Sequence, residues 1–477
     1  MKTLIVAVLM LLVSVSYAQQ PIAIVGGTLI DGTWGAPIQN SVVIIQGTKI
    51  IAVGTNENTR IPDGAQVIDA RGKYIMPGLI DCHVHYEQPR DLVQMLAWGV
   101  TSVNCMFEST DQALEMERRT ANDTIHSPQI YATAPIFTAK GGWWDEGFPI
   151  DSSINRFPAT PEEAREAVRK VKAKGIKRIK LMYDDMGWCR DTLQRLKKMD
   201  KNVMAALVNE AEKQDLLCEV HAPQLSDAKQ VIDVEANPRG LAFVHGITDQ
   251  SMASFSGSST TVGDKLLGYH LWYVSTFCVF EFLADTRGFM KSVLDDERFR
   301  TALPADVVRR YASEEYYRQY QERYPNITYL RSHLPLLREN LKRQIGFSET
   351  IPLGTDMWAL PGIAVHLELE YVVQAGMPPN LAVIAATNQA ANFLGEGRRK
   401  KIKPAKLSGV EKKINRDSSR VEHGKIGTIE VSKQADLLIL EANPLEDIRN
   451  TRSVRTIIKH GKIFGHQRLI EESKLMK

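Results

Sequence analysis

Two histidines stand two residues apart in the segment DCHVH, at His83 and His85. In a β-strand, residues i and i+2 point to the same face, so both imidazoles can reach one metal ion. The apolar run IMPGLID directly before them is typical of a buried strand. A histidine pair also occurs in cores and on surfaces without any function. What the other strands present therefore decides between a metal site and chance.

Four further candidate ligands stand in other apolar, strand-like runs: Lys180 in IKRIKLM, His221 in CEVHAP, His245 in FVHG and Asp356 in PLGTD. Each histidine alone fits a hydrogen-bonded core residue, and Lys180 alone fits an ion-paired strand-end lysine. Lys180 could instead be carboxylated by CO₂, and its anion would then bridge two metals. Nitrogen and oxygen donors without thiolates favour Zn²⁺ or a similar divalent ion in a catalytic site.

Eight apolar runs could carry these residues, and helical stretches separate most of them. The runs cover residues 75–81, 100–106, 129–135, 176–182, 217–222, 241–246, 273–280 and 350–356. One intervening helix is predicted to begin with Thr160 as N-cap, Pro161 in the first turn and Glu163 at the capping-box position. The pattern predicts an α/β fold, a (β/α)8 TIM barrel over residues 75–395. The candidate ligands then gather at its C-terminal mouth.

Short β-type runs with Gly-rich breaks occupy both ends of the chain. We expect residues 19–74 and 396–477 to form one split, small β-sandwich domain around the barrel. A strongly basic stretch over residues 398–420 is interpreted as an exposed insertion. A polar helical stretch over residues 289–346 is expected as an excursion between the seventh and eighth strands.

The N-terminus has the pattern of a secretory signal peptide: Lys2, an apolar run from Leu4 to Val13, then Ser16 and Ala18 at cleavage-site spacing. The apolar run is shorter than the roughly 20 residues of a membrane anchor. We expect removal of residues 1–18 with cleavage after Ala18, and a secreted or periplasmic protein that has no membrane segment in its mature form.

Composition narrows the classes of partner. The formal net charge is +3 at pH 7, so no polybasic surface for nucleic acid is indicated. Five cysteines without a CxxC pair argue against a disulfide scaffold. We expect a small-molecule substrate, and homo-oligomerisation is left open.

The order HxH, Lys, His, His, Asp on successive strands, preceded by PGLID, resembles the amidohydrolase superfamily. Within it the chain is similar to the imidazolonepropionase-like metal-dependent hydrolases, which include Xaa-Pro and Xaa-Arg dipeptidases. The segments HLELEYVVQAGMPP, AATNQAANFLG and KQADLLILEANPLEDI extend the resemblance over nearly all of the mature chain. Two features depart from it. HAPQ, with Pro223, replaces the common HAHG, and the basic stretch lengthens a link that is usually shorter.

The resemblance implies a binuclear metal centre with two Zn²⁺ ions. His83, His85 and Asp356 would hold one ion, His221 and His245 the other, and a CO₂-derived carbamate on Lys180 would bridge them. Metal binding lowers the pKa of a bound water from about 15.7 towards about 7. Asp356 would accept the proton of that water and pass it to the leaving nitrogen. The expected reaction is hydrolysis of an amide or peptide C–N bond by metal-bound hydroxide, in a dipeptide or N-acyl amino acid-like substrate.

Two alternatives remain at this stage. One keeps the fold with a single metal, an uncarboxylated Lys180, and imidazolonepropionase-like cyclic amidase or deaminase chemistry. The other is a secreted binding protein without turnover, against which the complete ligand set argues. Tyr183, Trp143 and Trp144 are expected either to line the substrate pocket or to pack its rim. His366, in a helical pattern, is predicted to be structural.

Overall fold

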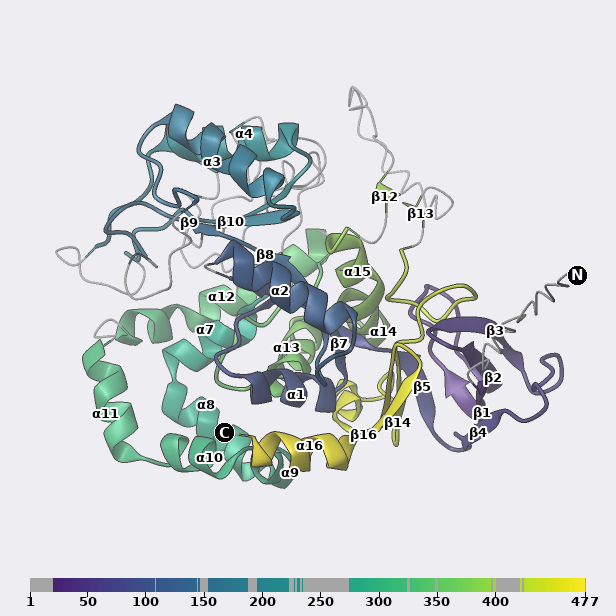
Figure 1. Ribbon diagram of the computed structural model, residues 1–477. Coiled ribbons are helices and arrows are strands. Elements are labelled where there is room, and N and C mark those ends of the chain that lie inside the picture. Colours follow the sequence, from purple (N-terminus) through teal and green to yellow (C-terminus); the bar gives the residue numbers. More distant parts are fainter. Residues whose placement is uncertain are drawn as a thin grey trace, which may run out of the picture.

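The computed structural model describes most of the 477-residue chain. The described residues are 20–107, 109–143, 145, 153–187, 195–222, 227, 230–231, 234, 274–323, 327–347, 351–395, 398–399, 421–422 and 424–476. Figure 1 shows a β-rich unit made from both chain ends beside a larger region in which strands and helices alternate. The predicted signal peptide, residues 1–18, lies outside the described residues.

Strands from both chain ends form one eight-stranded sheet. They are β1 (Ile22–Leu29), β2 (Ile38–Gln46), β3 (Lys49–Thr55), β4 (Gln66–Asp69), β5 (Tyr74–Pro77), β14 (Leu437–Leu440), β15 (Val454–Lys459) and β16 (Lys462–Gly465). The order is β16-β15-β14-β5-β1-β2-β3, and β4 pairs with β1. β14 runs antiparallel to β5, with Leu437 opposite Pro77. Ile24, Val43 and Ile75 lie in its buried core. The two chain ends thus share one sheet, as their matching strand patterns predict.

Six strands of the middle region form two parallel three-stranded sheets. β6 (Leu79–Val84), β7 (Val100–Met106) and β8 (Gln129–Thr133) make the first; β9 (Ile136–Phe137), β10 (Arg178–Met182) and β11 (Leu217–His221) make the second. Nearly all of their residues are buried, as expected of parallel strands covered on both faces. The Ala134 backbone N–H donates to the Arg178 carbonyl at 3.0 Å, which joins the two sheets.

The segment 351–356 continues the strand order on the other side of β6. The Cys82 N–H donates to the Leu353 carbonyl at 2.8 Å, and Ser275 pairs with Leu353 in a parallel bridge. The predicted sixth strand, residues 241–246, lies outside the described residues. The observed architecture is an α/β fold consistent with a TIM barrel.

Helices follow the parallel strands in the chain. They are α1 (Pro89–Ala97), α2 (Thr110–Ala121), α3 (Pro161–Ala173), α4 (Lys201–Lys213), α13 (Ile363–Gln374), α14 (Pro379–Ile384) and α15 (Ala390–Phe393), with a π-helical turn over Ala385–Gln389. The N-cap and the first residue of α3 are as predicted: Thr160 Oγ1 accepts a hydrogen bond from the Glu163 N–H at 3.2 Å, and Pro161 opens the helix. The Glu163 carboxylate accepts from the Ala159 N–H at 2.8 Å, one residue before the position of a capping box.

The expected seventh strand, residues 273–280, is wrong over most of its length. Ser275 forms an isolated parallel bridge with Leu353, but α7 (Phe277–Ala284) begins two residues later. The carboxylate of Glu368 on α13 accepts hydrogen bonds from the N–H groups of Phe277 (3.0 Å) and Cys278 (2.6 Å) and so caps α7. The apolar run could not reveal this, because a short buried helix and a buried strand look alike by periodicity.

The predicted helical excursion is present between Ser275 and Leu353 in the chain. It contains α8 (Thr286–Asp295), α9 (Glu297–Ala302), α10 (Ala305–Tyr311), α11 (Glu314–Arg323) and α12 (Ile327–Phe347). Figure 1 shows α8 to α11 along the lower edge of the molecule, with α9 beside α16. Arg452, just before β15, forms an ion pair with Asp296, between α8 and α9, at 3.0 Å.

The remaining described elements are the 3₁₀ turn Ile448–Arg452, α16 (His466–Leu475) and the short strands β12 (Arg398–Arg399) and β13 (Val421–Glu422), which pair antiparallel. Of the basic stretch 398–420, only β12 is described. No helix within the described part of the chain combines the length and the apolar character needed to cross a membrane. Four cysteines of the described residues, Cys82, Cys105, Cys218 and Cys278, are buried thiols outside any disulfide.

Candidate metal centre

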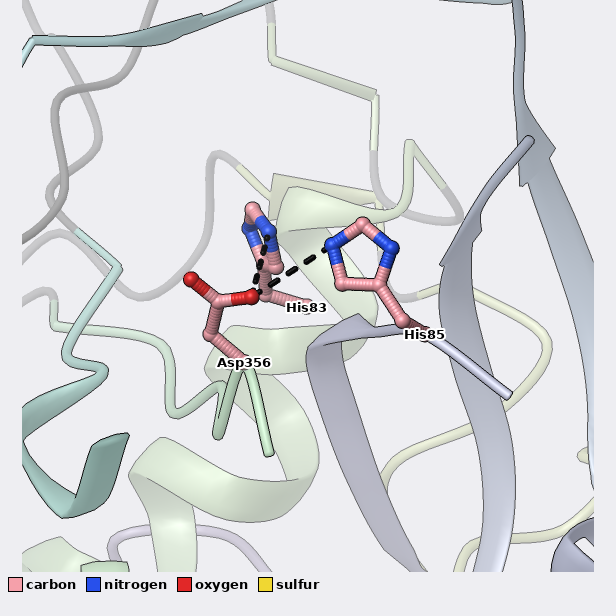
Figure 2. A group of neighbouring side chains, drawn as sticks. All are labelled: His83, His85 and Asp356. Carbon is pink, nitrogen blue, oxygen red and sulfur yellow. Dashed lines mark ion pairs between the residues drawn. The ribbon is translucent and has the colours of Figure 1, made fainter. Parts of the chain in front are cut away.

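His83, His85 and Asp356 come together at the end of β6, and we call them the histidine–aspartate cluster. Asp356 Oδ1 lies 3.5 Å from His83 Nε2 and 3.4 Å from His85 Nε2. Figure 2 shows both imidazoles turned towards this carboxylate oxygen. One ligand atom from each residue lies within 4.8 Å of the others, and all three side chains are largely buried.

These separations fit a shared metal ion better than they fit hydrogen bonds. N–H···O hydrogen bonds have donor–acceptor distances of roughly 2.7–3.2 Å, shorter than both contacts. Ligand atoms bound tetrahedrally at about 2.0–2.1 Å from Zn²⁺ lie roughly 3.3 Å apart. Two imidazoles and one carboxylate also match the three-ligand donor set of catalytic zinc sites. The residues present therefore fit a divalent ion.

The backbone brings the two parts of the cluster together. His83 lies in β6 and His85 directly after it, so both project from the same strand end. The His83 carbonyl accepts a hydrogen bond from the Asp356 N–H at 2.8 Å. Asp356 has a φ of 53°, a left-handed conformation that this bond helps to hold. At Gly354 a Cβ would lie 2.9 Å from the backbone nitrogen of His83, so only glycine allows this approach.

A buried carboxylate, Asp81, joins the two strand ends beneath the cluster. Asp81 Oδ1 accepts hydrogen bonds from the N–H groups of His83 (3.1 Å) and Thr355 (3.0 Å), and Oδ2 accepts one from Thr355 Oγ1 (2.7 Å). Burial raises the pKa of Asp81 to about 7, and these hydrogen bonds partly oppose the shift. Asp81 was not singled out from the sequence, although it directly precedes the HxH motif.

Lys180 lies inside the strand layer, opposite Glu219 in the β10–β11 ladder. Its side chain is fully buried, and burial lowers its pKa from 10.5 to about 8, against the opposing effect of the Glu219 and Asp356 carboxylates. Burial likewise raises the pKa of Glu219 to about 7. Glu219 accepts hydrogen bonds from Asn104 Nδ2 (2.5 Å) and Thr133 Oγ1 (3.3 Å), so four strands contribute to this buried polar layer.

His221 ends β11 but does not belong to the histidine–aspartate cluster. Its Nε2 lies 3.0 Å from Oδ2 of Asp184, which follows β10 in the chain. Sequence reasoning missed Asp184. The available signal was an acidic pair directly after the Lys180 strand, in the segment LMYDD.

The predicted pocket aromatics are only partly described. Trp143 is half-buried and packs against a small apolar group of Met106, Ile136 and Met182 at the strand ends. The hydroxyl of Tyr183 donates to Gln230 Oε1 at 2.8 Å, and the Tyr183 side chain is buried. His245 and Trp144 lie outside the described residues.

His366 has the structural role predicted for it. It is fully buried in α13, with Nε2 3.0 Å from the Trp98 carbonyl and Nδ1 2.9 Å from Thr451 Oγ1. Burial lowers its pKa to about 3, so it remains neutral in the folded protein at neutral pH.

A family model described as the amidohydrolase family matches residues 74–423, which include every predicted ligand. This chain belongs to the amidohydrolase family. The protein is therefore a hydrolase of carbon–nitrogen bonds, from a family whose members generally depend on divalent metals.

Known proteins resemble this amidohydrolase over almost its whole length. The ochratoxinase of Aspergillus niger is 24% identical over 486 residues, which cover 92% of this chain and 86% of that protein. A crystal structure of that ochratoxinase has a TM-score of 0.65 at 21% identity, with 94% of this chain and 96% of that chain covered. A Xaa-Pro dipeptidase with methionine bound in its active site has a TM-score of 0.67 at 20% identity, covering 94% and 100%. The two structures show a shared fold.

Proposed function

We propose that this amidohydrolase is an exported enzyme that hydrolyses an amide or peptide C–N bond in a dipeptide or N-acyl amino acid-like substrate. The observation that carries the proposal is the histidine–aspartate cluster, whose spacing suits a shared divalent ion better than hydrogen bonds. The likeness to a Xaa-Pro dipeptidase and to an ochratoxinase supports the choice of substrate class.

The proposed architecture keeps the domain bounds expected from sequence, with the seventh strand reduced to the bridge at Ser275. Residues 75–395 form a closed (β/α)8 barrel, and residues 19–74 with 396–477 form a split β-sandwich. Residues 1–18 are the signal peptide, removed after Ala18, which places the mature enzyme in the periplasm or outside the cell.

We propose that the cluster holds one Zn²⁺ ion and that His221 and His245 hold a second, with carboxylated Lys180 between them. When bound, such ions would lower the pKa of a coordinated water and polarise the scissile carbonyl. Asp356 Oδ1 faces both imidazoles. In this assignment Oδ2 is the oxygen that accepts a proton and returns it to the leaving nitrogen. Asp81 keeps Asp356 and His83 in register during the reaction.

Lys180 is suited to carboxylation because its lowered pKa keeps part of the population as the neutral amine. That amine attacks CO₂: an N–C bond forms, one C=O π bond of CO₂ opens and leaves its electron pair on oxygen, and the nitrogen releases one proton to solvent. Unlike the ammonium and the neutral amine, the carbamate provides oxygen donors for a metal ion.

The one-metal alternative, a cyclic amidase or deaminase, is favoured by one observation. Glu219 lies opposite Lys180, and its carboxylate stabilises the ammonium form. A ¹³C NMR spectrum recorded after incubation with ¹³C-bicarbonate distinguishes the two cases. A carbamate on Lys180 gives a carbonyl signal that is missing from the spectrum of Lys180→Arg.

The function is tested by assaying the metal-loaded protein against dipeptides, N-acyl amino acids, lactones and cyclic ureas, together with His83→Ala. We expect amide hydrolysis by the wild type, and loss of both bound metal and activity in the variant, since a ligand is removed. A His83→Ala protein with unchanged metal content and full activity would exclude the proposed centre.

A further inference from the structure

His221 makes a close contact to a carboxylate that the sequence did not suggest. Its Nε2 lies 3.0 Å from Asp184 Oδ2, and the side chains are 10% and 0% exposed, respectively. This distance lies inside the hydrogen-bond range, unlike the contacts of the histidine–aspartate cluster. The pair is therefore a hydrogen bond that uses one defined ring nitrogen.

Asp184 is itself anchored by the backbone. Its Oδ1 accepts a hydrogen bond from the Met186 N–H at 2.9 Å, while Oδ2 faces the imidazole. The Tyr183 N–H donates to the His221 carbonyl at 2.9 Å, which keeps the ends of β10 and β11 adjacent. The carboxylate thus reaches His221 from a fixed position.

The contact determines which ring nitrogen faces a metal. A neutral imidazole carries a proton on one nitrogen and a lone pair on the other. The Asp184 carboxylate can only accept a hydrogen bond, so the His221 nitrogen that faces it must carry the proton. Nε2 is therefore the N–H donor, and Nδ1 carries the lone pair. Metal-binding histidines commonly donate their other N–H to a carboxylate in this way, which sets the tautomer and the ring orientation.

We propose that Asp184 is a positioning residue that holds His221 in the Nε2–H tautomer and presents Nδ1 to the second divalent ion. This inference rests on the proposed function, since it assumes that His221 is a ligand. Asp184 touches the imidazole, and its effect on metal binding passes through that ring.

The neighbouring Asp185 supplies a matched control. Its Oδ1 accepts a hydrogen bond from the Gly187 N–H at 2.9 Å, as Asp184 does from Met186, and its Oδ2 lies 3.3 Å from Arg195. Asp185→Asn therefore makes the same chemical change one residue away, in a side chain whose described contacts are to Gly187 and Arg195.

The experiment is a titration of the metal-free protein with Zn²⁺ in the presence of a competing chelator, for wild type, Asp184→Asn and Asp185→Asn. We expect Asp184→Asn to bind one of its two ions about 10–100-fold more weakly, with the affinity for the other ion unchanged. Asp185→Asn should match the wild type. Wild-type affinity for both ions in Asp184→Asn would overturn the inference and leave the proposed function standing.

A zinc-loaded crystal structure of the wild type gives an answer that does not depend on a variant's folding. Zinc on His221 Nδ1, with Nε2 against Asp184, is the expected result. Zinc on Nε2, or zinc at the histidine–aspartate cluster with none at His221, would overturn the inference. A wild-type protein that binds no divalent ion would instead overturn the proposed function itself.

Discussion

The histidine–aspartate cluster is positioned by backbone hydrogen bonds, whereas Lys180 is positioned beside another buried charge. Around the cluster, Asp81 accepts hydrogen bonds from two backbone N–H groups and one hydroxyl, and these bonds join β6 to the segment 351–356. Around Lys180, the carboxylate of Glu219 lies opposite on the next strand and favours the ammonium form.

The two arrangements respond differently to chemical change. The Asp81 hydrogen bonds fix the geometry of β6 and the segment 351–356 whether or not a metal ion is bound. Lys180 is held at the cost of desolvation: the fall of its pKa to about 8 corresponds to roughly 3 kcal/mol against the charged form. Carboxylation would reverse the sign of that charge beside Glu219. The cluster is thus organised in advance, while the geometry at Lys180 depends on its covalent state.

The largest expected effect on activity is at Asp356, in the histidine–aspartate cluster. Asp356→Asn retains an oxygen that can coordinate weakly, but it cannot accept a proton. We expect kcat to fall by about 10²–10⁴ with a smaller change in KM. The check is kcat and KM against pH for both proteins at matched metal occupancy. A wild-type kcat with an unchanged acidic limb would remove the proton-transfer role.

A smaller, partly reversible effect is expected at Lys180. Lys180→Ala should lose activity, because the bridging oxygens are removed. Short carboxylic acids should restore part of it, since the cavity admits a free carboxylate. Activity is measured with and without added acetate or propionate, with Asp356→Asn as the variant that these acids do not rescue. A fully active Lys180→Ala enzyme would show that no bridge is needed and would favour the one-metal alternative.

Substitutions at Asp81 test whether the histidine–aspartate cluster depends on the buried carboxylate beneath it. Asp81→Ala removes the acceptor for His83 and Thr355, and we expect metal affinity to fall about 10–100-fold. Asp81→Asn keeps one acceptor oxygen for the two N–H groups and should lose less. Chelator competition measures both. Equal affinities in Asp81→Ala and the wild type would mean that the strand ends hold the ligands without help.

His366 provides the smallest expected effect on metal binding and a contrast with the ligand histidines. Its folded-state pKa of about 3 lies below the usual value of 6.5. Below about pH 6.5 the unfolded chain takes up a proton that the folded protein does not. The stabilisation is therefore complete above that pH and is lost as pH falls towards 3, at up to about 1.4 kcal/mol per pH unit.

His366→Gln should flatten this part of the stability–pH curve and leave zinc binding unchanged. Denaturant unfolding at pH 4, 5, 6 and 7 measures the slope, with the wild type as reference. An unaltered slope would show that His366 does not cause the acid sensitivity.

Much of the site could be predicted because it depends on local spacing. The i, i+2 placement of His83 and His85 requires only that their segment is a strand. The start of α3 at Pro161 follows from the Thr160 cap and the proline that comes after it. The position of Asp356 at the end of the last apolar run followed from strand order in an α/β fold.

The errors and omissions came from contacts between distant parts of the chain. The seventh run became α7 because Glu368, on a different helix, binds its first N–H groups. Asp81 was missed because its hydrogen bonds to Thr355 join β6 to a segment 274 residues later in the chain.

By itself, the sequence determined the types of donor atom, their order along the chain and the strands that carry them, since these follow from residue identity and periodicity. Only the tertiary structure decided the rest: the 3.4–3.5 Å convergence of His83 and His85 on Asp356, the burial that lowers the pKa of Lys180, and the pairing of Asp184 with His221. The physical reason is that hydrogen bonding and desolvation depend on which groups meet in space, and parallel strands place residues from remote segments side by side.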